Sequence, residues 1–229
     1  MNSTALLLFA GTMLISLWAT MRVKSVYARW SQVPARSGAS GAEVAAAILD
    51  RAGIRDVEIV AHDEMLGDHY DPLHKRLVLS QQNYYGQSVA ALGVSAHECG
   101  HAIQHAQAYG PLHMRMAAVG ATQFAQHIVL ILPILGFFSG LLYQALWGMA
   151  IAWGVIMLFN LVTLPVEFDA SSRAKEILSS MGFIGTEEEV RGVKQTLDAA
   201  GWTYVAAFIT SLAYLLWHLL PLIGGGRRD

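Results

Sequence analysis

The stretch "MAAVGATQFAQHIVLILPILGFFSGLLYQALWGMAIAWGVIMLFNLVTLP", residues 116–165, decides the fold because it contains no Lys, Arg, Asp or Glu. An α-helix rises about 1.5 Å per residue and the hydrocarbon core of a bilayer is roughly 30 Å thick, so the stretch is long enough for two crossings. We therefore expect a helical hairpin over 117–137 and 143–164. The residues that favour a turn between its helices are Gly136, Ser139 and Gly140.

Two more uncharged runs lie before and after the hairpin in the sequence. Residues 5–21 have no Lys or Arg before them and no convincing cleavage site after them, which favours an uncleaved anchor over a signal peptide. Residues 199–226 are a fourth candidate crossing, with a re-entrant or interfacial helix as the alternative. We therefore expect a multi-pass protein in contact with the lipid bilayer.

Composition and charge agree with this class. Hydrophobic residues make up 54% of the chain and charged residues 14%, against about 25% charged residues in soluble domains. The net charge of −2 gives no sign of a nucleic-acid partner. Cys99 is the only cysteine, so the chain can form neither an internal disulfide nor a cluster of cysteine ligands.

The positive charges predict an orientation. Thirteen of the fifteen Lys and Arg residues lie in two segments, nine in 22–115 and four in 166–198. Cytoplasmic flanks of membrane helices carry the excess of positive charge. We therefore expect both segments on the cytoplasmic side of a plasma or inner membrane, with the N-terminus outside. The two remaining charges are Arg227 and Arg228 in the tail.

The first polar segment is expected to contain both helices and strands. A short amphipathic helix should end near Gly53. Alternating, β-branched residues predict strands over 57–60 and 76–80, with the turn-prone residues 67–72 between them. Residues 87–107 contain no proline and few β-branched residues, so they predict one helix of roughly twenty residues.

That long helix contains the sequence "HECGH", residues 97–101. His97 and His101 lie four residues apart, on one face of a helix, and can bind a single metal ion. Glu98 is rotated by about 100° from His97, so it can accept a proton from water beside the ion without being a ligand. The arrangement is typical of metal-assisted hydrolysis; the alternative is an ordinary polar pair. Gly100 would permit another segment to approach closely.

A catalytic zinc ion typically has three protein ligands and one water, so a ligand must come from elsewhere in the chain. The expected hairpin returns the chain to the same membrane face just after Pro165, and Glu167 is the nearest carboxylate there. We therefore expect His97, His101 and Glu167 to hold one Zn²⁺, although ligand type alone does not separate zinc from other divalent ions. The alternative for Glu167 is a charge that solvates a helix end.

Several neighbouring polar residues have alternative roles. Asp169 is the second candidate for the third ligand, or an acceptor for the N–H group of a ligand imidazole. Arg173 could pair with a carboxylate, stabilise an oxyanion or lie on the surface. His105 is offset by another helical turn, which makes polar helix surface the expected role. Turn chemistry is the simplest explanation for Asp68, His69 and Asp71.

The stretches "GDHYDPLHKRLVLS", "SVAALGVSAHECGHAIQH" and "LPVEFDASSRA" together closely resemble the YugP-like family of bacterial membrane zinc metallopeptidases, and the resemblance covers nearly the whole chain. It implies zinc ligands at His97, His101 and Glu167, with Glu98 as the base. It also implies a membrane-bound endopeptidase, distantly similar to HtpX and CAAX-processing proteases, whose polypeptide substrates could include membrane proteins. In that wider group Asp often follows the Glu ligand by four residues, whereas residue 171 here is Ser.

The expected fold is mostly α, with integral membrane helices and a small α+β zincin-like domain, gluzincin-like in its ligands, that carries HExxH on a helix. In such enzymes an extended substrate typically pairs with an edge strand beside the zinc helix. The candidate edge strand consists of Arg76, Leu77, Val78, Leu79 and Ser80. The expected segments are a transmembrane anchor (1–22), a catalytic region (23–115), the hairpin (116–165), a cytosolic helical segment with the third ligand (166–198), and a C-terminal transmembrane helix with its tail (199–229).

Two other functions are alternatives to the peptidase. The chain could be a non-catalytic module whose metal site is structural or senses the ion, but a structural site has no use for the base Glu98. It could also be a scaffold in a membrane assembly or homo-oligomer, with the hairpin as its interface. The residues that would suit such an interface are Gly136, Gly140, Gly148 and Gly154.

Overall fold

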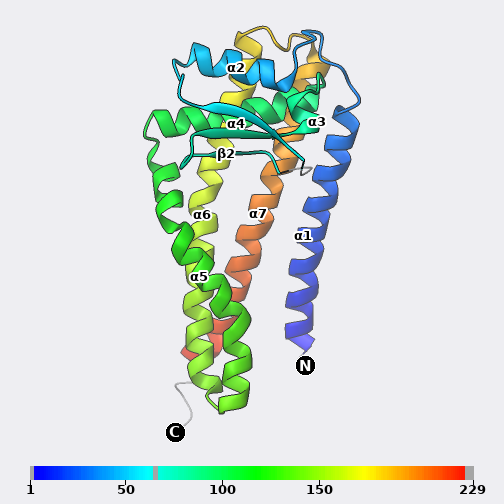
Figure 1. The fold of residues 1–229 in the computed structure, drawn as a ribbon. Helices are drawn as coiled ribbons and strands as arrows, with labels where there is room; N and C mark the ends of the chain where they lie inside the picture. Colours follow the sequence, from blue (N-terminus) through cyan, green and yellow to red (C-terminus); the bar gives the residue numbers. More distant parts are fainter. Residues whose placement is uncertain (1–2, 64–66, 225–229) are drawn as a thin grey trace. The chain divides into compact units, whose positions relative to one another are not determined.

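The computed structural model describes residues 3–63 and 67–224, which are mostly helical and include a small three-stranded sheet (Figure 1). The chain forms two compact units. The membrane unit comprises Met1–Trp18, His113–Leu164 and Thr203–Asp229, and the site unit comprises Ala19–Leu112 and Pro165–Trp202. The expected five-segment division stays a prediction, and the tail arginines at 227 and 228 lie outside the described residues.

Four helices of the described chain are long and apolar enough to cross a membrane. They are α1 (Ser3–Trp30), α5 (Gly110–Ser139), α6 (Leu142–Ser180) and α7 (Glu187–Gly224). The prediction of a mostly helical chain with four candidate membrane crossings is therefore confirmed.

The turn between α5 and α6 forms where the sequence predicts it. Gly140 has a φ of +73°, in the left-handed region that glycine adopts without steric cost. Gly136 lies inside α5 instead of the turn, and a Cβ atom there would be 2.6 Å from the Cβ of Ala145. At Gly148 an added Cβ would be 2.3 Å from Leu132 Cδ2. Two of the glycines named for a partner interface thus allow close packing within the hairpin.

Polar side chains connect α6 to α7 inside the membrane unit. Asn160 Nδ2 donates to the carbonyl of Ala207 at 3.2 Å and to Ser211 Oγ at 3.0 Å. The rings of Trp153 and Tyr214 stack with their centroids 4.6 Å apart. Because hydrocarbon offers no hydrogen-bond partners, such contacts favour association of two membrane helices.

Both α6 and α7 are longer than the sequence predicts. Helix α6 continues through Pro165 to Ser180, whereas we expected the crossing to end at residue 164. Proline removes one backbone donor, but the remaining hydrogen bonds carry the helix onward. Thr186 caps α7 as predicted, because Thr186 Oγ1 accepts from the Glu189 amide at 3.2 Å and Glu189 Oε2 accepts from the Thr186 amide at 2.9 Å.

The site unit contains the remaining short elements. The predicted helix ending near Gly53, the strands and the long helix are all present, and the turn-prone segment also contains a short strand. The elements are α2 (Gly41–Arg51), β1 (Glu58–His62), β2 (His69–Asp71), β3 (Arg76–Ser80), α3 (Gln81–Tyr84) and α4 (Val89–Ala106). Figure 1 shows α4 between α2 and the sheet.

The sheet order is β1-β3-β2, so the prediction that Arg76–Ser80 is an edge strand is wrong. Strand β3 pairs in parallel with β1 along its whole length and antiparallel with β2 at Arg76, Leu77 and Val78. The sequence hid this arrangement because β2 has only three residues and lies within the turn-prone segment 67–72, between Gly67 and Pro72. The outer strands are β1 and β2.

Candidate metal centre

Helix α4 carries the "HECGH" sequence through the interior of the site unit. Ser88 caps it, with a side chain that accepts a hydrogen bond from the Ala91 amide. The helix packs against both α2 and the sheet, and most of its side chains are buried. Polar side chains on such a helix must be partnered or serve a purpose that outweighs the cost of burial.

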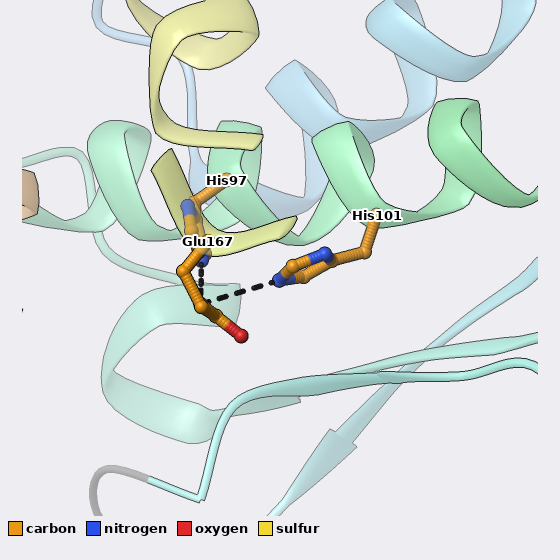
Figure 2. Close-up of side chains that lie close together, drawn as sticks. All are labelled: His97, His101 and Glu167. Carbon is orange, nitrogen blue, oxygen red and sulfur yellow. Dashed lines mark hydrogen bonds and ion pairs between the residues drawn. The ribbon is translucent and has the colours of Figure 1, made fainter. Parts of the chain in front are cut away.

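The structure brings together the three residues predicted to bind the ion. His97 and His101 extend from α4 toward Glu167 on α6, as Figure 2 shows. Glu167 Oε2 lies 3.2 Å from His97 Nε2 and 3.6 Å from His101 Nε2. One donor atom from each residue lies within 4.8 Å of the others, and this is the one such cluster of three or more found among the described residues.

A close approach of α6 to α4 makes this convergence possible. A Cβ atom at Gly100 would lie 2.8 Å from the carbonyl oxygen of Ala170 and 3.0 Å from its Cα. Only glycine leaves room for the α6 backbone here, and Glu167 lies nearly one turn before Ala170 on that helix. The prediction that Gly100 permits another segment to approach is confirmed.

The cluster fits a divalent cation by its donor set. Two imidazole nitrogens and one carboxylate oxygen are the three protein ligands of many catalytic zinc sites. Both Nδ1 atoms are engaged elsewhere, His97 with Ser171 Oγ at 3.2 Å and His101 with Gln104 Oε1 at 3.0 Å. Those contacts direct both Nε2 atoms toward the same point. Burial lowers the pKa of His101, but the hydrogen bond and charge of Glu167 raise it above its ordinary value.

Glu98 is, with Ser95, one of two buried polar residues of α4 whose side chains have no hydrogen-bond partner among the described residues. Its side chain is only 7% exposed, yet no described residue donates a hydrogen bond or forms an ion pair with its carboxylate. Its carboxylate oxygens are not among the fully buried side-chain atoms that lack a partner, so they reach solvent. A water molecule or a substrate amine is therefore the kind of group that this side chain can bind.

Asp169 and Arg173 are connected to the three clustered residues through Gln104. Asp169 is not in the cluster and contacts neither ligand imidazole; its Oδ2 accepts from Gln104 Nε2 at 2.8 Å and from Arg173 Nε at 2.6 Å. Arg173 Nη1 also donates to Gln107 Oε1 at 2.8 Å. Arg173 is thus paired with a carboxylate, one of its expected roles.

The other polar residues named from the sequence have local partners. His105 Nδ1 lies 2.9 Å from the Tyr70 hydroxyl. Asp71 accepts from the amides of Leu73 and His74, which is the turn chemistry expected of it. The remaining two are Asp68, which accepts from the Ser80 amide, and His69, whose Nδ1 faces the Gly67 carbonyl.

Sequence reasoning missed two residues that contact the imidazoles, Gln104 and Ser171. Gln104 lies three residues after His101, a spacing that brings side chains together on a helix. Ser171 lies four residues after Glu167, at the position where the wider group often has Asp. A search for polar residues at these helical spacings would have found both.

Comparisons with known proteins place nearly the whole chain in one family. The profile of the family described as "Putative neutral zinc metallopeptidase" matches residues 5–223. The chain is 43% identical over 211 residues to "Putative membrane protease YugP" of Bacillus subtilis (strain 168), which covers 92% of this chain and 93% of the relative. No solved protein structure matches the chain significantly. The chain belongs to the neutral zinc metallopeptidase family.

Proposed function

We propose that this protein is a membrane-bound, zinc-dependent metalloendopeptidase in which Glu98 is the general base. One observation carries the proposal: His97, His101 and Glu167 cluster near Glu98, whose carboxylate acts on His101 by its charge but has no hydrogen-bond or ion-pair partner among the described residues. A structural metal site needs the ligands but not the base. The family match supports the same conclusion.

The reaction assigns a task to each residue. His97, His101 and Glu167 would hold one Zn²⁺, which supplies a Lewis acid that polarises the scissile carbonyl and lowers the pKa of bound water to about 7. Glu98 accepts a proton from the attacking water as the C–O bond forms. Glu98 then passes that proton to the leaving amine as the C–N bond breaks.

The sheet suggests how an extended substrate binds. Strand β2 is an outer strand that packs against α4, and its Tyr70 hydroxyl lies 2.9 Å from His105 Nδ1. A peptide added to the free edge of β2 would pair through its backbone, so it would bind with little sequence preference. We assign substrate pairing to β2 in place of the central strand β3.

We also propose that the site lies on the cytoplasmic side of a bacterial inner membrane. The site is formed by two chain segments, 22–115 and 166–198. Together they contain thirteen of the fifteen Lys and Arg residues. Positive residues are retained on the cytoplasmic side of membrane helices. Cysteine accessibility in intact cells and in inverted vesicles measures this orientation directly.

The test of function compares Glu98→Gln with wild type in detergent, with bound zinc measured on the same samples. We expect Glu98→Gln to keep one equivalent of zinc and to cleave an unfolded protein substrate about 10²- to 10⁴-fold more slowly. Glu188→Gln, at an exposed position of α7, is the matched control and should behave as wild type. A zinc-loaded Glu98→Gln protein that cleaves at the wild-type rate would contradict the role of Glu98. Zinc binding by wild type without cleavage of any peptide in a library would favour the non-catalytic alternative.

A further inference from the structure

The amide of Gln104 links a ligand histidine to helix α6. Gln104 is completely buried on α4. Its Oε1 lies 3.0 Å from His101 Nδ1, and its Nε2 lies 2.8 Å from both the Val166 carbonyl oxygen and Asp169 Oδ2. The Gln104 side chain therefore contacts the imidazole of one candidate ligand, His101. It also contacts the backbone of Val166, which directly precedes the candidate ligand Glu167.

These contacts fix the orientation of the amide. A backbone carbonyl and a carboxylate are both acceptors, so the end of Gln104 that faces Val166 and Asp169 must be the NH₂ group. The other end, which faces His101, must then be the carbonyl oxygen. Because that oxygen can only accept, His101 Nδ1 must carry a hydrogen and donate it. The neutral imidazole then has its lone pair on Nε2, the atom that faces the ion site.

His97 has no comparable constraint. Its Nδ1 lies 3.2 Å from Ser171 Oγ. A hydroxyl can donate or accept, so Ser171 is compatible with either neutral form of His97. The two ligand imidazoles therefore differ, since one is held in a single form by an amide and the other meets an adaptable hydroxyl.

Asp169 and Arg173 keep the Gln104 amide in this orientation. Asp169 Oδ2 accepts from Gln104, and Arg173 Nε donates to the same oxygen at 2.6 Å. Arg173 is held in turn by Gln107, at 2.8 Å from Nη1, and lies 6.0 Å from the ring centroid of Tyr109. The charge of Asp169 is thus balanced by Arg173 and does not act on an imidazole directly.

We propose that Gln104 is a positioning residue that holds His101 with its hydrogen on Nδ1 and its Nε2 toward the metal ion, and that Asp169 and Arg173 act through Gln104. The inference rests on the zinc-binding part of the proposed function and not on peptide hydrolysis. It explains why Asp169, the acidic residue nearest to Glu167 in the sequence, is hydrogen-bonded to Gln104 and not to a ligand histidine.

The experiment measures zinc affinity by competition with a chromophoric chelator, and the visible absorption of the Co²⁺-substituted protein. Gln104→Met removes the acceptor and both donors, and we expect zinc to bind about 10- to 100-fold more weakly with an altered Co²⁺ spectrum. Gln104→Glu also lacks the amide donors, but its carboxyl group keeps an acceptor for Nδ1 and can share a proton with Asp169. We expect Gln104→Glu to stay within about threefold of wild type. Gln82→Met, the same change at an exposed position of α3, is the matched control and should bind zinc as wild type does.

The pair Gln104→Met and Gln104→Glu separates positioning from simple helix packing. If Gln104→Glu bound zinc as weakly as Gln104→Met although it keeps an acceptor for Nδ1, that acceptor would not determine the affinity, and the proposal would be wrong. Wild-type zinc affinity in Gln104→Met, or an equal loss in Gln82→Met and Gln104→Met, would also overturn it. If Gln104→Met does not fold, near wild-type affinity and spectrum of Gln104→Glu support the proposal and a loss of tenfold or more rejects it. Peptide cleavage enters none of these measurements, so a failed peptidase assay leaves the result intact.

Discussion

Helices α4 and α5 follow each other in the chain and are both rich in apolar residues, but they bury them against different surroundings. In α4, Val89 and Leu92 are completely buried by other parts of the protein. In α5, Leu130 is 70% exposed and Phe124 is 69% exposed, and only 11% of its most apolar window is buried within the chain. The apolar surface of α5 suits lipid, whereas that of α4 forms the protein core.

The polar residues of the two helices differ in the same way. His101 and Gln104 of α4 are buried and hydrogen-bonded to each other, and they contact α6. His127 of α5 is exposed, and its Nδ1 is hydrogen-bonded to the carbonyl of Gln123 in its own helix. Buried polar groups are generally hydrogen-bonded, and in α4 the partners of Gln104 come from another helix, whereas Thr122 of α5 bonds within its own helix.

The largest difference between the helices should appear in metal binding. We expect His97→Ala to weaken zinc binding by about 10³-fold, because binding free energies of roughly 10 to 16 kcal/mol are divided among about four ligands. His127→Ala makes the same change on α5 and should leave zinc affinity unchanged. Equilibrium dialysis with metal analysis measures both. Equal losses in the two variants would mean that the cluster on α4 and α6 is not the metal site.

The same apolar truncation should also have different effects on the two helices. Leu92→Ala creates a cavity in the core of the site unit and should lower the free energy of unfolding by about 3 kcal/mol. Leu130→Ala removes a side chain from an exposed face of α5 and should cost well under about 1 kcal/mol. Thermal unfolding in detergent, followed by circular dichroism, compares them. A cost at Leu130 as large as at Leu92 would show that α5 is packed against protein.

Added methyl groups should sharpen the contrast further. Gly100→Ala places a Cβ 2.8 Å from the Ala170 carbonyl, so α6 must move. We expect a destabilisation of about 2 kcal/mol together with weaker zinc binding. Gly120→Ala on α5 meets nothing within 4 Å and should be neutral or slightly stabilising. Unchanged zinc affinity and stability in Gly100→Ala would contradict the close approach of α4 and α6.

The smallest expected effect is on stability, from two neighbouring carboxylates at the start of α7, before its apolar run begins. Glu189 is buried and Glu188 is exposed. Burial raises the pKa of Glu189, but hydrogen bonds from the amides of Arg36, Gly185 and Thr186 and from the Thr186 hydroxyl lower it from 4.5 to about 2. Because the folded-state pKa is depressed, the ionised carboxylate stabilises the fold fully above pH 4.5, and this contribution is lost as the pH falls toward 2.

Glu189→Gln should therefore cost about 1 kcal/mol at neutral pH and show a weaker loss of melting temperature than wild type on acidification. Glu188→Gln, at the exposed neighbouring position, is the control and should follow the wild-type pH dependence. Melting curves between neutral pH and pH 3 make the comparison. Identical acid sensitivity of Glu189→Gln and wild type would show that this carboxylate does not stabilise the fold.

Much of the architecture follows from local patterns in the chain. The uncharged runs predict the four candidate crossings, because hydropathy over about twenty residues is a property of one continuous segment. The four-residue spacing of His97 and His101 predicts that both face one point, because helical geometry is local as well. The choice of Glu167 rested on a weaker argument, the return of the hairpin to the same membrane face.

Only the tertiary structure decided which distant groups meet. Strand order depends on backbone pairing between segments, so the sequence did not reveal that β3 is central or that three residues of a turn-prone segment form the outer strand β2. The sequence also did not reveal that α6 continues past Pro165, since proline by itself predicts a boundary. The contacts of Gln104 with His101 and Asp169 span 65 residues at their longest. Hydrogen bonds across such separations have no periodic signal in a single sequence, so the contacts of Gln104 with α6 could not be predicted, although its three-residue spacing from His101 has a local signal.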